Sequence, residues 1–89
     1  MTLDDVITWH AGEAERYVAI ARNWTEVAAA EQRRAKANPR SGANGVRAAQ
    51  FEGCANAAMG IAQRHLDMAH VLTPLSVITE RPARAERAA

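Results

Sequence analysis

Three histidines and one cysteine are the side chains of this sequence most suited to chemistry. His10 and Glu13 lie one helical turn apart, and an antiparallel pairing of the two halves of the chain brings His70 level with Glu13. Imidazole and carboxylate ligands suit zinc or iron, so these three residues form a candidate metal site. A di-iron bundle, however, pairs Glu-x-x-His motifs on facing helices, and the second half of the chain has none. His10 and His65 also fall at packing positions, where a hydrogen-bonded core histidine is commoner, and we expect no metal and no cofactor.

Cys54 is the only cysteine of the chain, and its thiol is a candidate nucleophile. It falls on an apolar stripe beside Phe51 and Ala58, where a cysteine behaves as a small buried hydrophobe. The sequence also lacks a P-loop, a GxGxxG turn, a CxxC pair and a GxSxG elbow. We therefore expect that the chain is not an enzyme.

These side chains belong to two long stretches of helical periodicity. Thr2 followed by Asp5 predicts a capped helix start. Apolar positions then recur in steps of three and four, at Leu3, Ile7, His10, Ala14, Tyr17, Ala21, Trp24, Ala28, Glu31 and Ala35. After a segment rich in Gly, Asn and Pro, the pattern resumes at Phe51, Cys54, Ala58, Ile61, His65, Met68 and Leu72. Pro74 is expected to end or kink this second helix.

The pattern predicts an all-α fold built on one long antiparallel helical hairpin. We expect helices over about 3–37 and 46–73, joined by a turn over 38–45, within a hairpin domain of residues 1–79. Residues 80–89 mix Arg, Glu, Ala and Pro without a core pattern, which is typical of a flexible charged tail. No apolar run approaches the roughly 20 residues that a membrane span requires, so we expect a soluble protein.

A second copy of the chain is expected to complete the core. The chain has only 89 residues, 4% of them aromatic, and the apolar face of the first helix is wider than one partner helix can cover. A small-residue track on the second helix would let another backbone approach closely: Ala49, Gly53, Ala57 and Gly60. We therefore predict a homodimer that forms a four-helix bundle. In the alternative, a monomer folds its own C-terminal apolar residues over the open face: Leu75, Val77 and Ile78.

Charge is distributed unevenly although the formal net charge is only +1. Cations gather around the turn: Arg33, Arg34, Lys36, Arg40 and Arg47. Acidic residues mark the opposite end: Asp4, Asp5, Glu13 and Glu15. Cations also complement the dipole at a helix C-terminus, so part of this pattern has a purely structural explanation. The functional interpretation is a docking patch for an acidic protein surface or a nucleic-acid backbone, although few aromatic residues are interleaved for stacking on single strands.

Trp9 lies next to the predicted seam and not on it. Tryptophan is enriched at binding hot spots, so Trp9 could anchor a dimer or a partner; covering the end of the bundle is the alternative. The predicted partner-binding residues are therefore Trp9, Arg33, Arg34, Lys36, Arg40 and Arg47.

Trp9-His10 with Ala14 and Arg22, followed by Phe51, Cys54 and Ala55, resembles small uncharacterised helical proteins encoded by temperate phages and prophages. Where that group has a His after the Phe, this chain has Glu52. The resemblance implies no enzyme activity and an accessory or anti-defence role, as in anti-CRISPR proteins that occupy a surface of a larger nucleoprotein complex.

We therefore expect a non-enzymatic protein-binding module, a phage-encoded inhibitor of a host defence complex that uses its basic turn and the exposed faces of its long helices. A metal-binding helical bundle and a small nucleic-acid-associated protein are the alternatives. A single cysteine and no signal-like opening segment lead us to expect the cytoplasm, that of the host cell if a phage encodes the chain.

Overall fold

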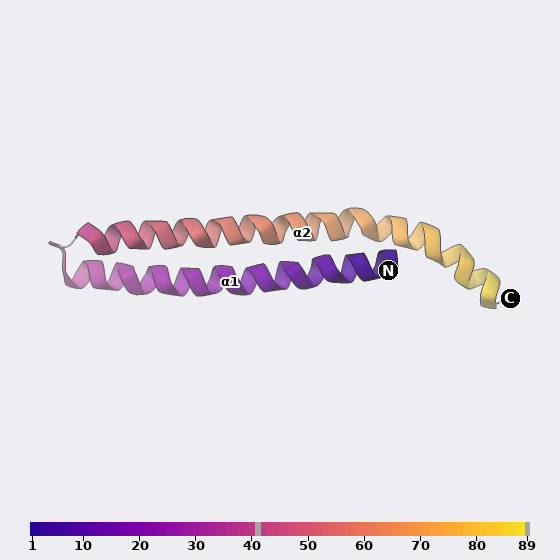
Figure 1. The fold of residues 1–89 in the computed structure, drawn as a ribbon, viewed down its shortest axis with the longest axis horizontal. Helices are drawn as coiled ribbons and strands as arrows, with labels where there is room; N and C mark the ends of the chain where they lie inside the picture. The colour runs from indigo at the N-terminus through magenta and orange to yellow at the C-terminus, as the bar shows by residue number, and fades with distance from the viewer. Residues whose placement is uncertain (41, 89) are drawn as a thin grey trace.

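Two long helices make up the fold (Figure 1). The computed structural model describes the backbone of residues 1–40 and 42–88 and the side chains of residues 1–40 and 42–76. Helix α1 spans Leu3–Ala37 and helix α2 spans Gly42–Ala88, and the two lie side by side in antiparallel directions. The predicted all-α hairpin is confirmed. Neither helix, over the described residues, has an apolar stretch long enough to cross a membrane.

Helix α1 begins and ends where the sequence predicts. The Thr2 hydroxyl accepts a hydrogen bond from the Asp5 backbone amide at 3.1 Å, and the Asp5 carboxylate accepts one from the Thr2 amide at 2.8 Å. This capping box satisfies two amides that a helix start otherwise leaves without partners. At the other end the Asn38 amide donates to the Arg34 carbonyl at 2.9 Å, and Pro39 follows. The predicted boundaries of 3–37 are confirmed.

The predicted boundaries of α2 are wrong at both ends. The helix begins at Gly42 and not at 46, and the Asn44 side chain accepts a hydrogen bond from Arg47 one turn later at 2.8 Å. It also continues past Pro74, although proline removes one helical hydrogen bond. Figure 1 shows α2 bending where it passes the N-terminus of α1, so the proline is accommodated by curvature.

The C-terminal segment belongs to this extended helix. Residues 75–78 continue α2 and do not fold back over the open face, as the monomeric alternative required. The side chains of Val77 and Ile78 lie outside the described ones. The predicted tail starts within α2, whose backbone runs to Ala88, and its flexibility stays a prediction.

The seam between α1 and α2 consists of two rows of side chains that repeat every seven residues. One row is small and buried: Ala14, Ala21 and Ala28 in α1, with Ala48, Ala55 and Ala62 in α2. The other row is mostly large: His10, Tyr17, Trp24 and Glu31 in α1, with Phe51, the buried Ala58, His65 and Leu72 in α2. Alanine has a single methyl group, so this row lets the two helices approach closely, while the larger side chains fill the space beside it. The seam predicted for α1 is confirmed.

The seam predicted for α2 is partly wrong. Cys54 and Met68 are exposed, and Ala55 and Ala62 lie at the contact instead. Steps of three and four can be drawn along two adjacent stripes of one helix, because 3.6 residues make a turn. The prediction followed the stripe with the larger side chains, whereas the alanine stripe permits the closer helix contact. Cys54 is therefore not the buried hydrophobe that we expected.

The core of the hairpin is thin. Among the described side chains, only seven alanines, Glu31 and Ser76 are buried, and no large apolar side chain is among them. The molecule measures 74 × 17 × 16 Å, so almost every large side chain is close to its surface. One methyl group contributes about 0.8 kcal/mol when buried, so the alanine row positions the helices but gives modest stability.

Candidate functional site

A cluster of four rings lies at the seam, three from the N-terminal half of α1 and one from α2. His10 Nδ1 and His65 Nδ1 are 2.9 Å apart, a hydrogen bond in which one imidazole donates and the other accepts. Trp9 meets both imidazoles edge to face, with ring centroids 4.9 Å from His10 and 5.5 Å from His65. Tyr17 stacks on His65 at 5.9 Å. We call these four residues the histidine cluster. Ring packing and one part-buried hydrogen bond within it join α1 to α2.

The structure does not bring the candidate metal residues together. His10 lies against His65, the Glu13 carboxylate is 3.5 Å from Arg16, and His70 is exposed. Within the described part of the chain, no three His, Cys, Asp or Glu side chains lie close enough to hold a metal ion. The predicted packing role of His10 and His65 is confirmed.

The register of the helices explains this difference. His65 contacts both His10 and Tyr17 across the seam, and Trp24 stacks on Phe51 nearer the turn. Glu13 lies between His10 and Tyr17 on α1, so it is level with His65 and not with His70. The turn is shorter than predicted because α2 begins at Gly42, and each residue removed from the turn shifts the pairing along α2.

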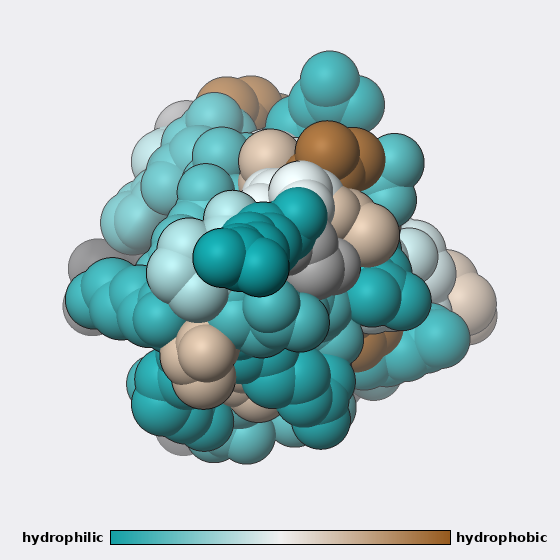
Figure 2. Space-filling model, turned by 90° about the vertical axis from the view of Figure 1, so that its left-hand side faces the viewer, coloured by the Kyte–Doolittle hydropathy of each residue, from teal (hydrophilic) through white to brown (hydrophobic). Residues whose placement is uncertain are grey.

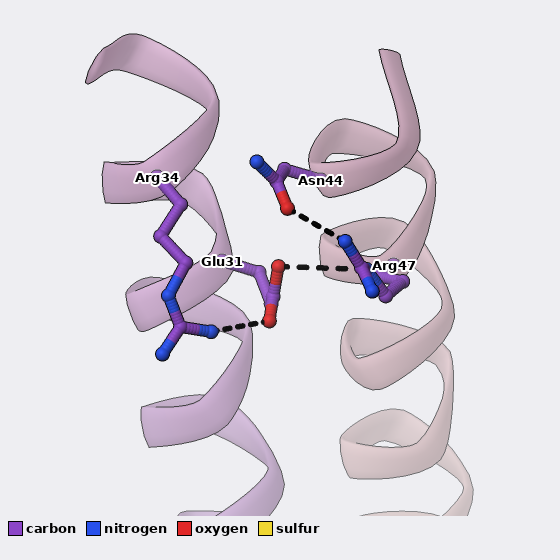
Figure 3. Close-up of polar contacts among 4 residues, drawn as sticks. All are labelled: Glu31, Arg34, Asn44 and Arg47. Atoms are coloured by element: carbon purple, nitrogen blue, oxygen red, sulfur yellow. Dashed lines mark hydrogen bonds and ion pairs between the residues drawn. The ribbon is translucent and has the colours of Figure 1, made fainter. Parts of the chain in front are cut away.

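A second polar site lies at the turn end of the seam, around the buried Glu31 (Figure 3). Arg34 of α1 reaches one carboxylate oxygen, with Nη1 2.6 Å from Oε1. Arg47 of α2 approaches the other, with Nε 3.7 Å from Oε2, and donates to the Asn44 side chain at 2.8 Å. Oε2 has no hydrogen-bond partner, so its charge is balanced by the nearby guanidinium alone. Sequence reasoning placed Glu31 on the seam but missed this role, which its spacing of three residues from Arg34 could have indicated.

Glu31 divides the predicted basic patch into two sets. Arg34 and Arg47 are held against its carboxylate. Arg33, Lys36 and Arg40 are exposed, and none of them has an acidic partner among the described residues. Hydrophilic residues cover most of the turn end of the molecule (Figure 2). We call Arg33, Lys36 and Arg40 the basic turn.

Trp9 lies far from the basic turn. It is 56% exposed and belongs to the histidine cluster. It is 24 residues before Arg33, which is about 36 Å along α1. The residues predicted to bind a partner therefore form two separate surfaces.

Cys54 has no histidine beside it on its own helix, since His65 is eleven positions away, or about 16 Å.

Comparisons of this chain with protein families, with curated proteins and with solved structures found no match.

Proposed function

We propose that this chain is a non-enzymatic protein-binding module that docks its basic turn on an acidic surface of a larger protein complex. The observation that carries the proposal is the group of three exposed cations, Arg33, Lys36 and Arg40, at the end of a stiff helical hairpin. The ion pair between Glu31 and Arg47 joins α1 to α2 directly behind them. Arg33 and Lys36 lie on a formed helix, so presenting them to a partner costs little backbone freedom.

The structural role of the cations accounts for only part of their placement. Lys36 lies in the last turn of α1, where a cation complements the negative end of the helix dipole. Arg40 lies beyond that helix and before the start of α2, whose first turn has no acidic residue. A helix start already carries partial positive charge, so Arg40 raises the positive potential there and does not offset it. Such a concentration of charge favours docking on an acidic surface.

The resemblance to helical phage and prophage proteins supports a class of target. We propose that the partner belongs to a host defence nucleoprotein complex, such as a CRISPR effector, which the chain inhibits by occupying a surface in the host cytoplasm. A small rod with a charged tip suits inhibition by covering a surface, because such a role needs no catalytic group. Direct binding of the same cations to a nucleic-acid backbone is the competing explanation.

Matched charge reversals test the proposal. Tagged wild-type protein, R33E/R40E and R22E/R64E would be used to capture partners from nuclease-treated lysate of the source cell, with identification by mass spectrometry. The two variants change the net charge equally, and all four arginines are exposed. We expect wild type and R22E/R64E to retain a stoichiometric protein partner, and R33E/R40E to bind it about 10-fold more weakly, as two lost surface charge contacts imply.

Three outcomes would count against protein docking by the basic turn. The two double variants could weaken capture equally, or neither could weaken it. Capture could also depend on nucleic acid that survives the nuclease. In that last case the purified protein should bind a DNA or RNA duplex with an affinity that falls steeply with salt, which supports the nucleic-acid alternative.

A further inference from the structure

The hairpin has two long faces, one on each side of the seam. Arg34 and Arg47 meet Glu31 on one side, and the hydrogen bond from Gln32 to Glu52 crosses the other. Residues seven apart lie on the same side of a helix in a packed pair. The polar contacts near the turn therefore identify the side on which the other residues of each helix lie.

Counting in sevens from Arg34 and Arg47 defines a largely apolar face. Its residues are Val6, Ile20 and Val27 in α1, and Cys54, Ile61, Met68 and Leu75 in α2. Along its edges the same count places Trp9, Arg16 and Asn23 in α1, and Ala57, Arg64 and Val71 in α2. Glu13 is the one charged residue inside the α1 series, and it is paired with Arg16. We call this surface the apolar face.

The opposite face carries fewer large apolar side chains. Two shallow grooves on it are lined by Ala11, Val18, Met59 and Leu66 together with Glu15 and Arg22. Near the turn, Gln32 and Glu52 close this side. Most of the large apolar side chains that remain exposed therefore gather on the apolar face, where Val71 is 63% and Trp9 56% exposed.

We propose that the apolar face packs against the same face of a second copy of this chain, with the two hairpins antiparallel, to form a four-helix bundle. The inference is independent of the proposed docking function. Helix α1 is about 50 Å long and the hairpin about 17 Å wide, so one face offers roughly 850 Å². A stable interface buries about 800 Å² on each partner, which one such face supplies.

A second copy is the occupant that explains the thin core. The hairpin alone buries alanines, one serine and one glutamate among its described side chains, so its helices have little apolar area to hold them together. The chain exposes 6595 Å², about 1,500 Å² more than a compact monomer of 9.6 kDa, and part of that excess is the end of α2 beyond α1. A partner that the chain needs in order to fold must be present whenever the chain is made. A second copy of the same chain always meets this condition.

The charges of the two ends favour the antiparallel arrangement. A parallel dimer would place two basic turns side by side, and their like charges would repel. In the antiparallel dimer each basic turn lies beside the partner's N-terminal end, where α1 carries Asp4 and Asp5. The two basic turns then point in opposite directions, so one dimer presents two docking sites.

Matched substitutions on the two faces of α2 test the interface. M68E/V71E changes the apolar face, and M59E/L66E changes the opposite face; all four side chains are exposed in the hairpin. Sedimentation equilibrium should give wild type and M59E/L66E twice the chain mass of 9.6 kDa, and M68E/V71E a single chain mass at about 50 μM. A monomeric wild type, a larger assembly, or dissociation of M59E/L66E alone or of both variants would overturn the proposal.

A distance between labels tests the orientation with one small change, C54S, in the apolar face. A spin label on A37C in a C54S background lies at the exposed end of α1 in each copy. Electron paramagnetic resonance should give a label separation of about 50 Å for antiparallel hairpins, since the labels sit at opposite ends of the bundle. A separation below about 25 Å would show parallel hairpins, and the absence of any coupling between copies would show that no dimer forms.

Discussion

His10 and Glu31 occupy equivalent places on α1, three seven-residue repeats apart, yet the two ends of the seam are held together in different ways. At the N-terminal end, His10 finds its partner in His65, and both are covered by Trp9. At the turn end, Glu31 is balanced by two arginines whose side chains are 66% and 53% exposed. Each polar group has a partner across or beside the seam, although Glu31 Oε2 accepts no hydrogen bond and is balanced by charge alone.

The difference lies in where the partner comes from. The polar groups of the histidine cluster find their partners within the seam, so packed side chains cover this end of the hairpin. The charge of the Glu31 carboxylate is balanced by two guanidiniums that reach in from the surface, so these cations stay in contact with water at the turn. The same helix spacing thus gives one end that packs and one end that presents charge.

The largest expected effect comes from the alanine row that both ends share. Ala21 is 3% exposed at the middle of the seam, and A21L would force the helices apart or the leucine out of its preferred rotamer. We expect the free energy of unfolding to fall by about 3 kcal/mol, measured by urea denaturation followed by circular dichroism at one protein concentration. A19L, at an exposed position of the same helix, is the control and should change stability by less than about 0.5 kcal/mol. Equal effects of the two changes would mean that the seam does not set the helix distance.

The histidine cluster should be the next most sensitive place. H65A removes the ring that contacts Trp9, His10 and Tyr17, and we expect it to cost about 2 kcal/mol. H65F keeps the ring and loses the hydrogen bond, so it should cost about 1 kcal/mol. H70A, at an exposed position one turn further on, is the control for both. If H65A behaved like H70A, the N-terminal end would not be closed by this cluster.

The smallest effects, and the sharpest contrast, are expected at Glu31. E31M removes a desolvated carboxylate and leaves two arginines that water can solvate, so we expect a gain of about 1 kcal/mol in the free energy of unfolding. R47M leaves the carboxylate with a single partner and should cost about 1 kcal/mol. Chemical denaturation of the two variants gives both values. A loss in both would show that Glu31 stabilises the turn end as His65 stabilises the other end.

The local features of the fold could be predicted from the sequence. The Thr2 and Asp5 cap, the extent of α1 and its seam all follow from neighbours within a few turns, and the structure confirms them. The hairpin followed from two periodic stretches and the break between them. The partner-binding role of the exposed turn residues was predicted from charge alone and stays a prediction.

What the sequence by itself determined is therefore the pair of helices, the start of α1 and the row of its residues that faces a partner, because hydrogen bonds and helical periodicity act over short distances. The tertiary structure decided which stripe of α2 meets α1, and so left Cys54 exposed and Ala55 buried. It also decided the register that joins His10 to His65 and the contact of Arg34 and Arg47 with Glu31. These choices depend on how closely two helices can approach, which is a property of both surfaces together and of neither sequence segment alone.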